Sequence, residues 1–112
     1  MTKAKVVLIP FPFDDLTVTK VRPAVCLTDP IGPHRHVVLA FISSQIPADL
    51  LDTDLVLNPS QPGFAGTGLR VASTLRLHRL MTATTKLILR DLGDLSPAMW
   101  AAAVERLHKL FN

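Results

Sequence analysis

The chain has 112 residues, of which 48% are hydrophobic, and it carries a formal charge of +3 with a pI near 9.5. This length fits one domain, which we expect to span residues 1–112 and to bury its core without disulfide or metal staples. A lone cysteine excludes an internal disulfide framework. Because no stretch approaches the about 18 apolar residues of a transmembrane helix, we expect a cytoplasmic protein with no membrane partner.

Short strand-like runs bounded by proline, glycine and aspartate follow one another along most of the chain. The longest irregular stretch, residues 58–68, contains two prolines and three glycines. The predicted strands cover residues 6–10, 24–28, 36–43, 55–57, 69–77 and 86–92.

One helix is predicted at the carboxyl end. Ser96 is a good N-cap, and Pro97 suits the first helical position because its missing N–H has no partner there in any case. Apolar residues then recur at helical spacing, which predicts a stripe that packs on the core or forms a dimer face. The stripe consists of Trp100, Val104, Leu107 and Phe111. Several short strands and one closing helix predict a mainly β fold, a small barrel with the helix packed across an opening.

The residues that usually carry metal or nucleophilic chemistry are scattered. The histidines lack the grouped spacing and the cysteine or carboxylate support of a zinc site, so we expect no metal and no cofactor. Cys26 lies in an apolar run and is expected to be a buried small hydrophobe. Basic residues crowd the stretch after the middle loop, which suits either an anionic partner or a solvated face. These residues are Arg70, Arg76, Arg79, Lys86 and Arg90.

Five segments, taken in order, resemble the MazF/PemK family of toxin ribonucleases. The family's first strand and the loop after it resemble VLIPFPFDDL at 7–16, and its Arg-Pro pair before an apolar run resembles KVRPAVCL at 20–27. FISSQ at 41–45 is similar to the end of its third strand. Gly68, Leu69, Ser73 and residues 75–77 are similar to its late strand, and GDLS at 93–96 to the lead into its last helix. The resemblance covers nearly the whole chain.

This resemblance implies an SH3-like β-barrel that is usually a homodimer and is the toxin of a type II toxin–antitoxin pair. The implied activity is sequence-specific, metal-independent cleavage of single-stranded RNA to 2′,3′-cyclic phosphate and 5′-hydroxyl ends. The implied second partner is a cognate antitoxin whose flexible acidic tail blocks the substrate groove. The family's catalytic arginine maps onto Arg22 and its catalytic threonine onto Ser43.

Both residue types suit that chemistry. When the ribose 2′-hydroxyl attacks phosphorus, negative charge builds on the phosphorane oxygens, and a guanidinium such as that of Arg22 stabilises this charge. The Ser43 hydroxyl would hold a non-bridging oxygen or relay a proton. The general base stays open among Asp14, Asp15 and an arginine perturbed by burial. The competing interpretations are an exposed loop charge for Arg22 and a simple strand end for Ser43.

Three further residues are candidates for RNA binding, namely Lys20, Gln45 and Arg76, with structural roles as the alternative. Phe11 and Phe13 are expected in the core, although stacking on exposed bases is the other interpretation.

The chain departs from the family pattern at four positions. Ala4 and Lys5 stand where the family has glycine and an acidic residue, Val21 ends a loop without the usual glycines and extra arginine, and Ser43 replaces threonine. These departures are compatible with altered specificity, weakened activity or an inactive relative. Two other functions stay open beside the ribonuclease. One is a gyrase-binding toxin of the CcdB type, although residues 109–112 lack the ending associated with that group. The other is an inactive barrel that only binds RNA or antitoxin.

Overall fold

The computed structural model describes residues 2–12 and 19–112, which form a mainly β structure with one α-helix at the carboxyl end. The strands are β1 (Lys5–Pro12), β2 (Thr19–Cys26), β3 (His36–Ser43), β4 (Asp54–Leu57), β5 (Ser73–Thr84) and β6 (Arg90–Asp94). Two short 3-10 helices, η1 (Ala65–Thr67) and η2 (Thr85–Leu87), precede β5 and β6, and α1 (Pro97–Leu110) follows them. The predicted fold class is confirmed.

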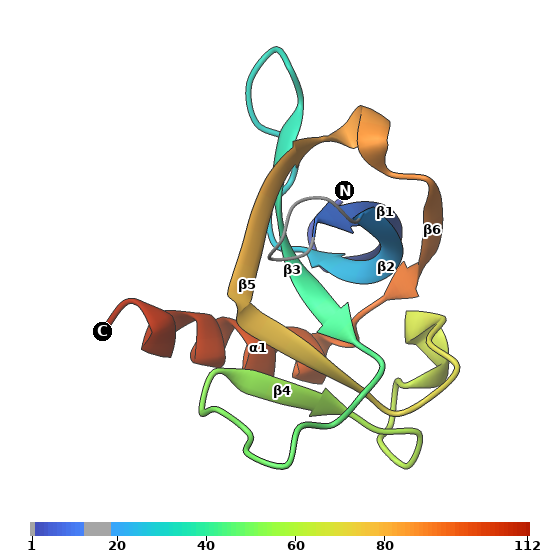
Figure 1. Ribbon diagram of the computed structural model, residues 1–112, viewed down its shortest axis with the longest axis vertical. Helices are drawn as coiled ribbons and strands as arrows, with labels where there is room; N and C mark the ends of the chain where they lie inside the picture. Colours follow the sequence, from blue (N-terminus) through green and yellow to red (C-terminus); the bar gives the residue numbers. More distant parts are fainter. Residues whose placement is uncertain (1, 13–18) are drawn as a thin grey trace.

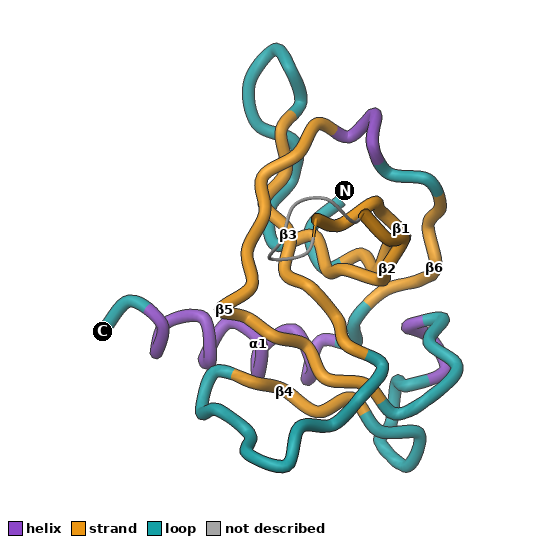
Figure 2. Tube along the Cα trace, in the orientation of Figure 1, coloured by secondary structure: helices purple, strands orange, loops and turns teal. Residues whose placement is uncertain are grey.

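All six strands belong to one antiparallel sheet in the order β4-β5-β3-β2-β1-β6. The sheet curls into a half-barrel, so that β1 and β2 are seen nearly end-on between β5 and β6 (Figure 1). Helix α1 crosses the end of the sheet where β4 pairs with β5, and the loops gather beside β4 and β6 (Figure 2).

The sheet buries both of its faces. Side chains alternate between faces along a strand, so neighbouring residues enter different cores. The first core lies under α1 and contains residues from every strand except β6 together with Phe64, Leu95, Met99 and Ala103. The second core lies on the opposite face of the central strands. Its buried residues are Val7, Ile9, Phe11, Ala24, Cys26, Val37, Leu39, Phe41 and Ala83.

A bulge in β5 changes which of the two cores its side chains face. Ala40 pairs with Leu80, but the next residue of β3, Phe41, pairs with Arg76, so three residues of β5 have no partner on β3. Such an insertion bends a strand and increases its twist, and β5 bends visibly near the middle of its length (Figure 1). Leu77 therefore enters the first core and Ala83 the second.

The predicted boundaries are correct for β3 and too short for the first hairpin. β2 begins at Thr19, not at residue 24, and β1 continues to Pro12. The prolines of β1 are tolerated because β6 pairs with β1 only as far as Leu8. Beyond that point, the missing N–H of Pro10 leaves no β6 residue unsatisfied.

The two late strands lie further along the chain than predicted. β5 begins at Ser73 and runs to Thr84, and β6 begins only at Arg90. The left-handed Gly68 ends η1, and the chain rejoins the sheet only at β5. The strand prediction for residues 69–72 and for residues 86–89 is therefore wrong.

Helix α1 begins as predicted. Ser96 is the N-cap, its Oγ accepts a hydrogen bond from the Met99 amide at 3.1 Å, and Pro97 follows it. Met99 and Ala103 are the buried positions, with Trp100 and Leu107 packed against the first core. Phe111 does not pack on the core, because it lies past the last helical turn as the C-cap and is 74% exposed, so its part in a dimer face stays a prediction. No helix in the described part of the chain is long and apolar enough to cross a membrane.

Alanine substitutions at two glycines with the same backbone geometry distinguish the cost of backbone strain from the cost of steric crowding. Gly32 and Gly68 have φ of +73° and +74°, but a Cβ at Gly32 meets nothing within 4 Å, whereas a Cβ at Gly68 would lie 2.1 Å from the Leu92 carbonyl oxygen. We expect Gly32→Ala to lower the free energy of unfolding by about 1 kcal/mol. Gly68→Ala should cost about 2 kcal/mol more, because the backbone of β6 must shift. Urea denaturation of both variants measures the difference, and equal losses would contradict the close packing of Gly68 on β6.

Candidate active site

Arg22 and Ser43 lie on the two strands that separate at one end of the sheet. The ladder between β2 and β3 ends at the pair Ala24 and Phe41. Two residues beyond it, on the same side of the sheet, come Arg22 on β2 and Ser43 on β3. Continuing the register of the ladder therefore sets these two residues across from each other at the point where the strands part, which we call the strand fork.

The second core forms the floor next to the strand fork. Arg22 lies on the same side of β2 as Ala24 and Cys26, which are fully buried in this core. Its side chain therefore lies at the edge of the core. The Phe11 and Phe41 rings lie 5.0 Å apart between their centroids and are nearly fully buried. The core role expected of Phe11 is confirmed, whereas Phe13 lies outside the described residues.

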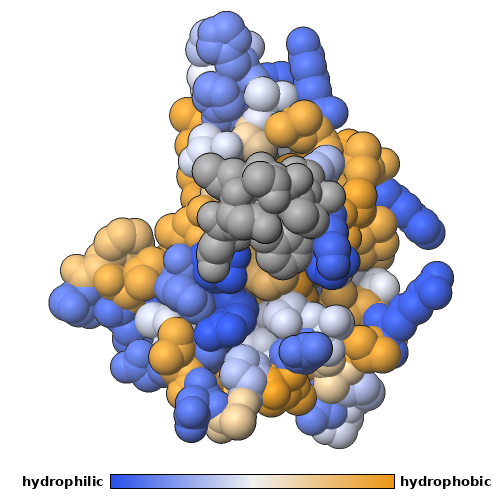
Figure 3. Space-filling view, viewed as in Figure 1, coloured by the Kyte–Doolittle hydropathy of each residue, from blue (hydrophilic) through white to orange (hydrophobic). Residues whose placement is uncertain are grey.

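Arg79 joins this face because of the β5 bulge. It is one of the three residues of the β5 bulge, and its guanidinium carbon lies 5.4 Å from the centre of the Phe41 ring. This is within the range of a cation–π contact. A hydrophilic patch lies over the bend of β5 in the space-filling view (Figure 3). Sequence reasoning counted Arg79 only among the basic residues, since no local signal marks a bulge there.

The hydroxyl of Ser43 is held by the backbone that follows it. Its Oγ accepts a hydrogen bond from the Gln45 amide at 3.2 Å, and the Gln45 carbonyl accepts one from Thr74 Oγ1 at 2.9 Å. Accepting one hydrogen bond leaves the Ser43 proton available for donation. The turn after β3 thus orients this serine, which lacks the methyl group that restricts a threonine rotamer. The side chain of Gln45 is exposed beside it.

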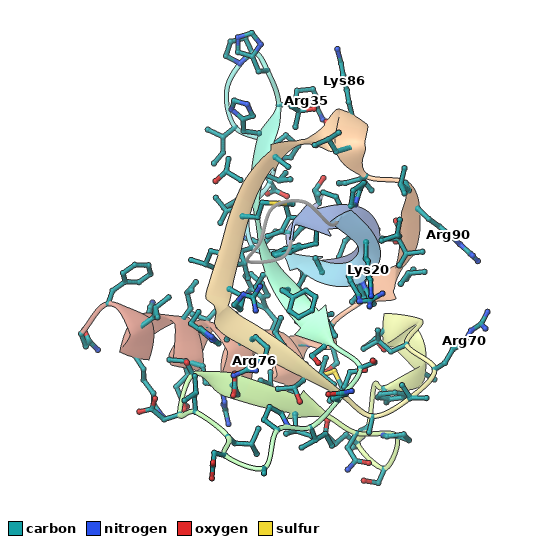
Figure 4. All side chains as sticks on the ribbon, viewed as in Figure 1. Lys20, Arg35, Arg70, Arg76, Lys86 and Arg90 are labelled. Atoms are coloured by element: carbon teal, nitrogen blue, oxygen red, sulfur yellow. The ribbon has the colours of Figure 1, made fainter. Side chains whose placement is uncertain are left out.

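Arg22 and Lys20 share one side of β2. The Arg22 Nη1 donates a hydrogen bond to its neighbouring Val21 carbonyl at 3.2 Å, and the arginine is half-buried. Lys20 is exposed, sits across from Phe11, and lies near the centre of the view in Figure 4. Cationic groups on one side of one strand suit an anionic ligand.

Arg76, by contrast, is tied to a buried carboxylate. Its Nε donates to Asp54 Oδ1 at 3.0 Å, and the Asp54 side chain is fully buried. The other Asp54 oxygen accepts the Leu51 amide at 3.0 Å, and the Asp54 carbonyl accepts Arg106 Nε at 2.8 Å. Asp54 therefore joins β4, β5 and α1. His78 lies 4.0 Å away, and burial followed by the Arg76 charge lowers its pKa.

The departures at the start of β1 are accommodated in the fold. Ala4 adopts a left-handed φ of +75°, which glycine would adopt without strain, because its N–H donates to Cys26 and its carbonyl accepts from Leu95. Lys5 forms ion pairs with Asp91 at 3.0 Å and Asp94 at 3.6 Å. Its hydrogen bond to Asp91 raises the Lys5 pKa, so the lysine stays charged.

Other reactive groups give little further chemistry. Among residues 2–12 and 19–112, no three histidine, cysteine, aspartate or glutamate side chains are grouped to hold a metal ion. Burial raises the pKa of the Cys26 thiol to about 11, so this cysteine is a core residue and not a nucleophile. The two candidate bases, Asp14 and Asp15, lie outside the described residues.

The chain matches a known family along nearly its whole length. The model of the family described as PemK-like, MazF-like toxin of type II toxin–antitoxin systems matches residues 2–111. No match is found among curated protein sequences.

Solved structures show the same fold at low sequence identity. The Mycobacterium tuberculosis toxin MazF-mt6 is 22% identical, with a TM-score of 0.68, and the match covers 94% of this chain and 95% of the toxin. A mycobacterial endoribonuclease in complex with its cognate antitoxin is 13% identical with a TM-score of 0.70, covering 99% and 94%. The Deinococcus radiodurans MazE–MazF structure is 13% identical with a TM-score of 0.66, covering 100% and 95%.

The contact between Arg76 and Asp54 separates the structural from the RNA-binding role of Arg76. Because Arg76→Met leaves a buried carboxylate without its cation, we expect the free energy of unfolding to fall by about 2–4 kcal/mol. Arg70→Met, which changes an exposed arginine in the loop before β5, serves as the control and should change stability by less than about 0.5 kcal/mol. Chemical denaturation without RNA measures both, and equal stability of the two variants would argue against a structural role.

Proposed function

Because the chain belongs to the PemK-like, MazF-like family of type II toxins, we propose that it is an endoribonuclease that cleaves single-stranded RNA at short sequences without a metal ion. The observation that carries the proposal is the placement of Arg22 and Ser43 on one side of the strand fork. The MazF-like and endoribonuclease structures with the same fold support it.

The reaction is a transesterification. The 2′-oxygen of the ribose forms a bond to the adjacent phosphorus while the bond from phosphorus to the 5′-oxygen breaks, giving a 2′,3′-cyclic phosphate and a 5′-hydroxyl. The 2′-hydroxyl loses a proton to a base, and the leaving 5′-oxygen gains one. Charge accumulates on the non-bridging oxygens between these events, and stabilising that charge is the main task of the protein.

In this proposal Arg22 contacts the non-bridging oxygens. A guanidinium offers two parallel charge-assisted hydrogen bonds and keeps its charge at neutral pH. Ser43 donates its hydroxyl proton to the same phosphate, because its Oγ accepts from the Gln45 amide and its proton has no acceptor in that bond. Lys20 and the side chain of Gln45 contact RNA on either side of the fork. A weaker case applies to Arg76, which Asp54 already engages.

The same proposal extends to partners. We propose that a cognate antitoxin covers the strand fork with an acidic segment, because Lys20 and Arg22 lie there and two structures of this fold include an antitoxin or MazE chain. We also propose that the protein is a homodimer in the cytoplasm. Phe111, 74% exposed at the end of α1, is an apolar group that a second copy would cover.

The decisive experiment for Arg22 is cleavage of a long single-stranded RNA in EDTA with mapping of the ends. We expect the wild-type protein to cut at a repeated short sequence and to leave 5′-hydroxyl ends. Arg22→Ala should lower the rate by about 10²–10³, since one transition-state contact is lost. The control Arg35→Ala removes the same charge in the turn between β2 and β3, which lies far from the fork (Figure 4). This variant should cut RNA at the wild-type rate. Intact RNA with folded wild-type protein would overturn the proposal.

Ser43 permits a test with a conservative variant. Ser43→Ala removes the hydroxyl and should lower the cleavage rate by about 10–10² without a comparable change in stability. Ser43→Thr restores the family's residue, keeps the hydroxyl and restricts its rotamer, so activity at or above the wild-type level is expected. Single-turnover rates of the two variants measure this. If Ser43→Ala cuts as fast as Ser43→Thr, the hydroxyl has no catalytic role.

A further inference from the structure

A pocket of about 270 Å³ lies behind the strand fork, on the face of the sheet opposite Arg22 and Ser43. Its walls are mainly aliphatic, and two arginines and two serines complete its lining. The lining residues are Leu8, Pro23, Ser44, Gly68, Leu69, Arg70, Val71, Ser73, Arg90 and Leu92. We call it the Arg70/Arg90 pocket.

The pocket continues the first core into solvent. Leu8 and Pro23 are paired across β1 and β2. They are two residues away from the pair Val6 and Val25, on the same face, and this pair is fully buried in that core. Leu92 on β6 packs at its side, and Gly68 lies so close to the Leu92 carbonyl that no side chain fits between them. Gly68 and Leu92 together form one wall of the pocket.

Two arginines flank this apolar cavity. Arg70 comes from the loop before β5 and Arg90 from the start of β6, and both are exposed. In Figure 4 they extend from the same side of the molecule, one from below and one from above, and Figure 3 shows hydrophobic surface on that side. Among the described residues, neither guanidinium has an ion-pair partner. Unpaired cations beside an apolar cavity suit a ligand with a flat apolar part and negative charges.

The pocket is continuous with the strand fork. Pro23 follows Arg22 and Ser44 follows Ser43, and adjacent residues of a strand point to opposite faces. Because the β2–β3 ladder ends at Ala24 and Phe41, the pocket borders the fork, and an RNA strand bound at the fork would bring its neighbouring bases to the pocket. Bases of single-stranded RNA are open to recognition because they need not be paired or stacked.

We propose that the Arg70/Arg90 pocket binds one nucleobase of the RNA strand next to the cleaved bond, with Arg70 and Arg90 on the phosphates that flank it; this inference rests on the proposed function. The aliphatic walls cover the faces of the base, and the Ser44 and Ser73 hydroxyls reach its edge. The pocket is therefore a specificity site, which selects the base at one fixed position from the cut.

Two sets of substitutions test the pocket. Val71→Trp fills it from a side chain that is 53% exposed, so we expect the fold to be retained, and thermal unfolding checks this. Arg70→Gln with Arg90→Gln removes its two charges. The matched control, Arg35→Gln with Lys86→Gln, removes two charges in the turn before β3 and in η2 beside it, far from the pocket in Figure 4.

Cleavage of a random-sequence RNA pool by otherwise wild-type protein gives the first readout. We expect Val71→Trp to abolish the base preference at one position relative to the cut while the other positions keep theirs. The control pair should leave all preferences unchanged. If Val71→Trp cuts with the wild-type preferences at every position, the pocket is not a base site.

Binding of a labelled single-stranded RNA pool to proteins that also carry Arg22→Ala gives the second readout, which needs no cleavage. Losing two phosphate contacts should reduce the slope of log affinity against log salt by about 1.4, and the control pair should not reduce it. Equal slopes for the two pairs would overturn the inference and open the pocket to an acidic peptide with an apolar side chain. If RNA binding depends on the pocket but the protein with Arg22 intact does not cut RNA, the pocket proposal stands and the proposed ribonuclease activity is wrong.

Discussion

The three unmatched residues of β5 are the constraint on which the rest of the structure depends. A regular strand such as β3 supplies both cores through alternating side chains, but the bulge between the pairs Ala40–Leu80 and Phe41–Arg76 reverses this alternation along β5, so that Leu77 faces the first core and Ala83 the second. The sheet can then curl and still exclude water from its two faces. The same turn sends neighbouring arginines in different directions, since Arg79 lies over Phe41 and Arg76 pairs with Asp54.

The separation of β2 from β3 has an equally direct effect on chemistry. Inside a continuous ladder, the two faces of a sheet are isolated from each other. At the strand fork they meet, so the side that carries Arg22 and Ser43 and the side that carries the Arg70/Arg90 pocket lie within one or two residues along each strand. A single extended polymer can therefore contact both. Under the proposed function, bond breaking and base selection take place on opposite faces of the sheet but close together in space.

The parts of the fold that local signals control could be predicted from the sequence. The bounds of β3 and the start of α1 at Pro97 follow from an apolar run and a Ser-Pro cap, and the structure confirms them. The bounds of β5 and β6 could not be predicted, because Gly68 and the bulge depend on contacts with distant strands. The site shows the same division. The positions of Arg22 and Ser43 follow from motifs, and their roles stay predictions. The pairing of Arg76 with Asp54 joins residues 22 positions apart and leaves no sequence pattern.

The ion pairs of Lys5 make the start of β1 a case of epistasis. An acidic residue at this position, which the family pattern favours, would stand against Asp91 and Asp94 and place three negative charges on one patch. A change of sign at position 5 alone would replace attraction by repulsion, which the exposure of the three side chains limits to about 1 kcal/mol. Relatives that differ here are best compared by the combined charge of positions 5, 91 and 94. Replacing β1 alone by the strand of such a relative would change the charge at position 5 without the matching change at positions 91 and 94.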